Sequence, residues 1–104
     1  MKVIVTGAGG QLGYDLVRLA TNRGWDVHGF SRLEMDVTDL DAVKERTTAI
    51  RPDAIIHAAA YTKVDLAEQE PELAYQVNAL GTRNVAIAAE EVGARLCYIS
   101  TDYV

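Results

Sequence analysis

The sequence is short of cysteine, of proline and of long apolar runs, and each shortage narrows what the chain can be. Its 104 residues include one cysteine and two prolines. A single cysteine cannot form a disulfide within the chain, which favours a cytoplasmic protein. No apolar run reaches the roughly 20 residues that cross a membrane, and no signal peptide precedes the first strand, so we expect no membrane partner.

The chain also lacks an excess of positive charge. Its formal net charge at pH 7 is −5 and it has no basic run, so we expect no nucleic-acid partner. Its apolar share of 49% is that of an ordinary globule, and 104 residues suffice for one domain with a core. The one cysteine, Cys97, lies in the apolar run 94–99, where we expect a buried strand residue rather than a nucleophile.

The start of the chain predicts a strand, a glycine turn and a helix in direct succession. Residues 3–5 are apolar and mostly β-branched, as in a buried strand, and residues 12–20 repeat leucine at helical spacing. Between them, Gly7, Gly10 and Gly13 fit the pattern G-x-x-G-x-x-G. Such a turn directs backbone N–H groups and the positive end of a helix dipole at an anion, usually a phosphate.

We therefore expect this glycine loop to hold a dinucleotide. The alternative is a tight turn that binds nothing, since a glycine pattern alone is a weak signal. The strand before it and the helix after it make the binding interpretation the stronger one. The expected contacts are Gly7, Gly10, Gln11, Leu12 and Gly13.

Strand and helix patterns alternate along the rest of the chain. We expect helices at about 11–23, 40–50 and 71–91, and further strands at 25–30, 53–60 and 95–100. Thr38 or Asp39 is suited to cap the second helix, and Pro71 to begin the third. The alternation predicts an α/β fold with a Rossmann-like, doubly wound parallel sheet that stops after its fourth strong strand.

The end of the second predicted strand bears on the choice of cofactor. A carboxylate at the end of this strand would bind the 2′-hydroxyl of NAD. The positions are occupied by Ser31 and Arg32, and the next carboxylate, Glu34, lies slightly too far along the chain. Arginine suits a 2′-phosphate, so we expect NADPH rather than NADH, unless Arg32 is only a solvated loop charge. Asp36 and Val37 follow, where an adenine could rest on the valine and bond to the carboxylate.

Small and polar residues after the third strand complete the expected site. Ala58, Ala59 and Ala60 would let ribose and diphosphate approach the backbone, and Tyr61 follows them. On the third helix, Asn78 is assigned to the cofactor side, although it could only brace a loop, and Asn84 needs a buried partner. The polar stretch 63–70 predicts a substrate-side loop or short helix. Its carboxylates are not spaced as metal ligands, so no metal residue is assigned.

Several motifs together resemble the extended short-chain dehydrogenase/reductase family. They are TGAGGQLG at 6–13, HAAAYT at 57–62, VD at 64–65, Asn78 followed by Gly81 and Thr82, and STDYV at 100–104. Within that family they are most similar to enzymes that reduce dTDP-4-dehydro-6-deoxy-L-mannose to dTDP-L-rhamnose. The resemblance implies a nucleotide-sugar substrate, NADPH or NADH as cofactor, often with Mg²⁺, and a possible homodimer of the full-length protein.

The resemblance also assigns Thr101 to the family's catalytic Ser or Thr, which hydrogen-bonds the substrate carbonyl. The family's other catalytic residues, a Tyr-x-x-x-Lys pair, match nothing in these 104 residues. We therefore interpret 1–104 as a partial NAD(P)-binding Rossmann domain without the substrate domain, and expect it to be inactive alone. The alternatives are a non-catalytic NAD(P)-binding module, such as a regulatory subunit of methionine adenosyltransferase, and a nucleotide-sugar epimerase or dehydratase.

Overall fold

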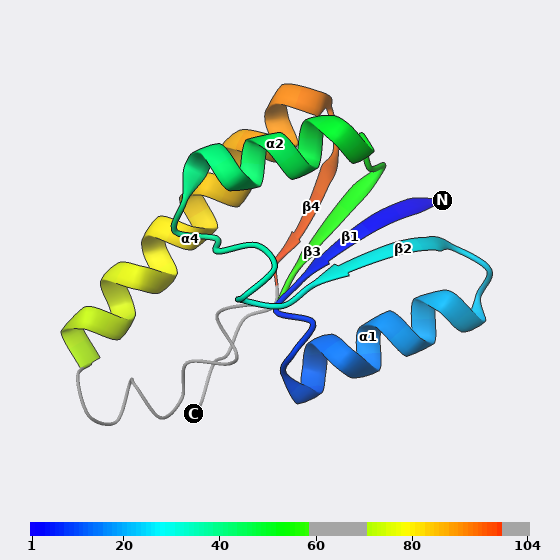
Figure 1. The fold of residues 1–104 in the computed structure, drawn as a ribbon, viewed down its shortest axis with the longest axis horizontal. Helices are drawn as coiled ribbons and strands as arrows, with labels where there is room; N and C mark the ends of the chain where they lie inside the picture. Colours follow the sequence, from blue (N-terminus) through cyan, green and yellow to red (C-terminus); the bar gives the residue numbers. More distant parts are fainter. Residues whose placement is uncertain (59–70, 99–104) are drawn as a thin grey trace.

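The computed structural model describes residues 1–58 and 71–98, which form a parallel sheet with helices on both faces (Figure 1). The elements follow the predicted alternation, with bounds that differ from the predicted ones by a few residues at most. In chain order they are β1 (Lys2–Thr6), α1 (Gln11–Asn22), β2 (Asp26–Phe30), α2 (Leu40–Ile50), β3 (Ala54–His57), α4 (Pro71–Val92) and β4 (Arg95–Tyr98). The predicted α/β, Rossmann-like class is confirmed.

The strand order is β2-β1-β3-β4, and every pairing is parallel. The chain therefore moves to one side of β1 for β2 and to its other side for β3. In open α/β sheets such a reversal leaves a crevice beyond the carboxyl ends of the strands, where ligands bind. Thr6 of β1 and His57 of β3 are paired in register at this point.

The main core lies between the sheet and two helices that cover one of its faces, α2 and α4 (Figure 1). Ile4 and Ile55 project from neighbouring strands and are almost fully buried there, against Val43 of α2 and Val85 of α4. Helix α1 covers the other face. A Cβ atom at Gly29 would come within 2.9 Å of Val17, so the close approach of α1 to β2 depends on that glycine.

The capping expectations are met at α2. Asp39 is its N-cap, and its carboxylate accepts a hydrogen bond from the Ala42 N–H at 3.3 Å. The helix ends at Arg51, which adopts a left-handed conformation with φ of 52°. The N-cap residue of α1 is instead Gly10, which has no side chain to cap the helix. The first backbone N–H groups of α1 therefore receive no hydrogen bond from the side chain of the N-cap residue. This arrangement is expected at a helix start that binds an anion.

Two burial predictions are wrong. Cys97 lies in a strand as expected, but it is exposed. Its strand, β4, is at the edge of the sheet and exposed along its whole length, with Tyr98 51% accessible. The helical spacing of apolar residues along α4 predicts a buried stripe that includes Leu80, but this leucine is 41% exposed. In both cases apolar composition was a poor guide, because burial depends on which element packs above the residue.

Candidate functional site

The glycine loop forms a tight turn between β1 and α1. Gly7 has a positive φ of 70°, which favours glycine, and its carbonyl accepts a hydrogen bond from the Gly10 N–H at 3.1 Å. Gly13 faces the same carbonyl from the first turn of α1. A Cβ there would lie 2.1 Å from the Gly7 oxygen, so only glycine fits. Both glycines are therefore needed for the loop to fold back against its own helix.

The two remaining loop residues of the predicted set lie on α1. Gln11 is exposed, and its amide nitrogen donates to the Asp15 carboxylate one turn later at 3.1 Å. Leu12 is half-buried. The Gln11 side chain thus lies along α1, bonded to Asp15.

The loop lies directly beside the end of β2. The Ala8 N–H donates to the Phe30 carbonyl at 3.0 Å. A Cβ at Gly9 would come 3.2 Å from the Cβ of Ser31, so these two residues are in close approach. The structure therefore brings together the glycine loop and the residues predicted to recognise the 2′ position, Ser31 and Arg32. Ser31 is half-buried and Arg32 is exposed.

Glu34 also belongs to this region, although it lies further along the chain than the position expected for a cofactor-binding carboxylate. Its carboxylate Oε1 accepts a hydrogen bond from the Ser31 N–H at 2.9 Å. This bond, with the Ser31 hydroxyl and the nearby Arg46 guanidinium, holds the pKa of Glu34 below its usual value. The spacing Ser-x-x-Glu is that of a capping box, and this signal could have identified the contact.

Helix α4 contacts the loop that carries the expected adenine-binding residues, Asp36 and Val37. The side-chain amide of Asn84 donates to the Val37 carbonyl at 2.9 Å, which confirms that this buried asparagine has a partner. A Cβ at Gly81 would lie 2.7 Å from Val37 Cγ2, so the helix touches the loop closely. Asp36 accepts from both the N–H and the hydroxyl of Thr38, at 3.0 and 2.7 Å. Asp36 therefore stabilises the turn that precedes α2.

A buried histidine, His57 of the HAAAYT motif, links the ends of the two central strands, although no role was predicted for it. His57 is 1% exposed, with Nδ1 2.8 Å from the Thr6 hydroxyl and Nε2 3.2 Å from that of Thr82. The Ala58 N–H donates to the Thr6 hydroxyl oxygen at 3.1 Å. Burial lowers the pKa of His57 to about 4, so its ring is neutral at physiological pH.

Other predicted residues fall beyond the described part of the chain. Ala59, Ala60, Tyr61, Thr101 and the stretch 63–70 lie outside it, whereas Ala58 is buried and Asn78 is half-buried on α4. Among residues 1–58 and 71–98, no three His, Cys, Asp or Glu side chains are grouped to hold a metal ion. Within the same ranges, no helix has the length and apolar character that crossing a membrane requires.

The comparisons with known proteins agree on one family. The family described as RmlD substrate binding domain matches residues 1–104. The dTDP-4-dehydrorhamnose reductase of Mycolicibacterium smegmatis is 46% identical over 103 residues, or 99% of this chain and 31% of that protein. The spore coat polysaccharide biosynthesis protein SpsK of Bacillus subtilis is 39% identical, over 99% of this chain and 36% of that protein.

A solved structure extends the comparison to the fold. The dTDP-4-dehydrorhamnose reductase of Bacillus anthracis, crystallised in complex with NADP, superposes with a TM-score of 0.88 at 50% identity. The match covers 100% of this chain and 38% of that one. The chain thus spans about a third of the length of these relatives.

Proposed function

Because the chain belongs to the RmlD substrate binding domain family, we propose that it forms the NADP(H)-binding part of a dTDP-4-dehydrorhamnose reductase. The reaction is reduction of the 4-keto group of dTDP-4-dehydro-6-deoxy-L-mannose to give dTDP-L-rhamnose. The relatives that carry this name, and the NADP bound to one of them, support the proposal. Residues 1–104 act here as a partial Rossmann domain, and the sugar is bound mainly by a separate substrate domain.

The observation that carries the proposal is the contact between the glycine loop and the end of β2. Gly9 and Ser31 approach each other beside the uncapped start of α1. A dinucleotide needs this pairing, because its diphosphate binds at the helix start while its adenosine ribose binds at the next strand end. The close approach of Gly9 and Ser31 brings the two subsites next to each other.

The predicted residues then divide by the part of the cofactor that they bind. The diphosphate is bound by Gly7, Gly10, Gln11, Leu12 and Gly13. The 2′-phosphate is bound by Ser31 and Arg32, and the adenine by Asp36 and Val37. The ribose and diphosphate on the other side are bound by Ala58, Ala59, Ala60, Tyr61 and Asn78. The bound dinucleotide would supply the hydride, and Thr101 would hydrogen-bond the sugar carbonyl that receives it.

The test is an assay of the protein that carries this chain, with purified nucleotide-sugar and either NADPH or NADH. We expect sugar-dependent oxidation of NADPH, which Thr101→Val lowers mainly in kcat because the lost bond strengthens in the transition state. Thr48→Val, on the exposed side of α2, is the matched control and should leave the rate unchanged.

Two other outcomes would redirect the proposal. Tight NADPH binding without turnover of any nucleotide-sugar would favour the non-catalytic regulatory module. Residues 1–104 expressed alone should bind cofactor at most and show no turnover. Turnover by that fragment would contradict the proposed division of labour.

A further inference from the structure

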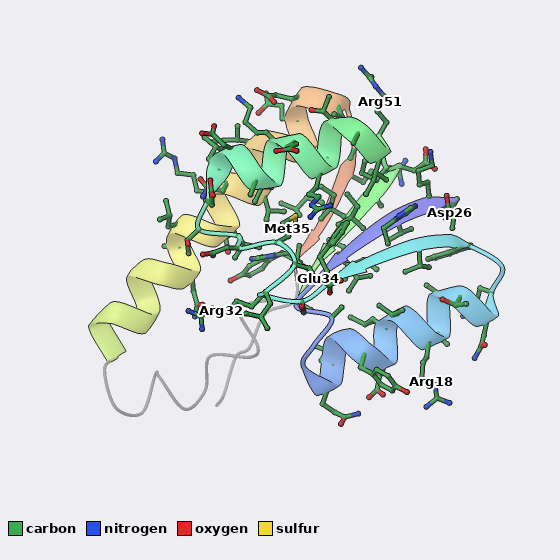
Figure 2. The ribbon with its side chains drawn as sticks, in the orientation of Figure 1. Arg18, Asp26, Arg32, Glu34, Met35 and Arg51 are labelled. Atoms are coloured by element: carbon green, nitrogen blue, oxygen red, sulfur yellow. The ribbon has the colours of Figure 1, made fainter. Side chains whose placement is uncertain are left out.

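The Ser31 amide stands where a cofactor's 2′ substituent is expected, and it already has an acceptor. Its N–H donates to Glu34 Oε1 at 2.9 Å, within a turn closed by bonds from the Glu34 and Met35 amides to the Ser31 carbonyl at 3.1 and 2.9 Å. Figure 2 shows Arg32 and Glu34 on the loop between β2 and α2, at the end of the sheet where the strands converge. The carboxylate is thus fixed in the region predicted to receive a phosphate.

The charges around Ser31 are mixed. Arg32 is exposed beside it, and the Arg46 guanidinium donates to the Glu34 carbonyl at 3.4 Å while lying over the Phe30 ring. The same surroundings keep Glu34 ionised at neutral pH, since its pKa is lowered. A 2′-phosphate placed here would meet two arginines, but also a carboxylate that occupies a backbone donor it could use.

The 2′-hydroxyl of NADH would interact more favourably with Glu34 than a 2′-phosphate would. It carries no charge to be repelled, and it can donate a hydrogen bond to an ionised carboxylate. Gly9 restricts the room on the other side of Ser31, because even a Cβ there would come within 3.2 Å of the serine.

We propose that Glu34 sets the cofactor specificity of this site, by competing with the 2′-phosphate of NADPH for the Ser31 amide and accepting the 2′-hydroxyl of NADH. The proposal rests on the proposed function, because it requires that the site bind a nicotinamide dinucleotide. Arg32 favours NADPH and Glu34 opposes it, so the preference is smaller than arginine alone would give.

The test compares dissociation constants for NADPH and NADH in the protein that carries this chain, with and without Glu34→Gln. Gln keeps the length and an acceptor oxygen but removes the charge. We expect tighter NADPH binding, by roughly three- to tenfold, with NADH unchanged or weaker, since one repelled charge at a few ångströms in water has about that effect. The gain should shrink at high salt because the charges are exposed.

Glu45→Gln is the matched control, since Glu45 is exposed on α2 and the substitution removes the same charge. It should leave the ratio of the two constants unchanged, while Glu34→Ala should move it as Glu34→Gln does. A ratio that Glu34→Gln leaves unchanged, or moves toward NADH, overturns the inference. Failure of the unsubstituted protein to bind either cofactor would instead overturn the proposed function, and the inference with it.

Discussion

The hydroxyl of Thr6 lies 2.8 Å from Nδ1 of His57 and joins the carboxyl ends of β1 and β3. The Thr6 oxygen also accepts a hydrogen bond from the Ala58 N–H at 3.1 Å, so one hydroxyl takes part in both contacts. Nε2 of the same ring lies 3.2 Å from the hydroxyl of Thr82 in α4. One neutral imidazole therefore connects the start of the glycine loop, the start of the 58–60 segment and a helix.

Protonation of His57 should destabilise the fold in acid. Its pKa is about 4 in the folded state and 6.5 in an ordinary solvated histidine, so the unfolded chain takes up the proton first. The full contribution is present above pH 6.5 and is lost as pH falls toward 4, by up to about 3 kcal/mol. Urea unfolding of the purified protein at several pH values within this window measures the loss.

The second histidine supplies the control for this prediction. His28 lies on β2, with Nε2 3.1 Å from the Asp26 carboxylate and its side chain 35% exposed. His28→Gln should preserve the acid-induced loss of stability between pH 6.5 and 4. His57→Gln should lower stability at pH 7 but flatten its dependence on pH, and an unchanged slope in that variant would show that another group is responsible.

The glycines of the loop should differ in their tolerance of alanine. Gly13→Ala would place Cβ 2.1 Å from the Gly7 carbonyl oxygen, a backbone atom, so the loop must move and the variant should lose roughly 1–3 kcal/mol of stability and most of its NADPH affinity. Gly9→Ala meets only the Ser31 Cβ at 3.2 Å and should weaken binding less. Fluorescence titration with NADPH and thermal unfolding separate the two effects.

Gly24→Ala is the control for this series. Gly24 ends α1 with φ of 81° and has open space around it, so alanine there meets backbone strain but no neighbour. It should lower stability by about 1 kcal/mol without changing the NADPH dissociation constant. Equal losses of affinity in the Gly24→Ala and Gly13→Ala variants would mean that the loop glycines serve folding alone.

The sequence predicted the elements well because their signals are local. Helical spacing, an Asp39 cap and a glycine-rich turn all depend on residues within a few positions of each other. The Thr6–His57 contact depends instead on two residues 51 positions apart, and on β3 lying next to β1. Alternating strands and helices do not determine that order, so the contact with Thr6 could not be predicted even though His57 opens the HAAAYT motif.

The missed contact between Glu34 and Ser31 and the wrong burial prediction for Cys97 have the same origin. The spacing of Ser31 and Glu34 is visible in the sequence, but whether the glutamate turns back to the Ser31 amide depends on the conformation of the loop between them. Cys97 was expected to be buried because its neighbours are apolar, whereas its exposure follows from the position of β4 at the sheet edge. The Glu34–Ser31 contact and the exposure of Cys97 both depend on tertiary structure, which cannot be inferred from composition.

Gly81→Ala should show opposite effects on stability in two backgrounds. Alanine is favoured over glycine inside a helix by about 1 kcal/mol, but its Cβ would lie 2.7 Å from Val37 Cγ2. The valine is β-branched and its carbonyl is held by Asn84, so it cannot easily rotate or retreat. In the unsubstituted protein the clash should outweigh the helix preference, and the variant should be less stable by roughly 1 kcal/mol.

Val37→Ala removes the atom that Gly81→Ala would meet, so the same change should then stabilise the protein by about 1 kcal/mol. A double-mutant cycle measured by urea unfolding gives the coupling between the two positions, which we expect to be about 2 kcal/mol. NADPH affinity should fall in Gly81→Ala if Val37 supports the adenine, and the double variant should not recover it, because the valine side chain is gone. Additive effects on stability would show that α4 does not hold the loop at Val37.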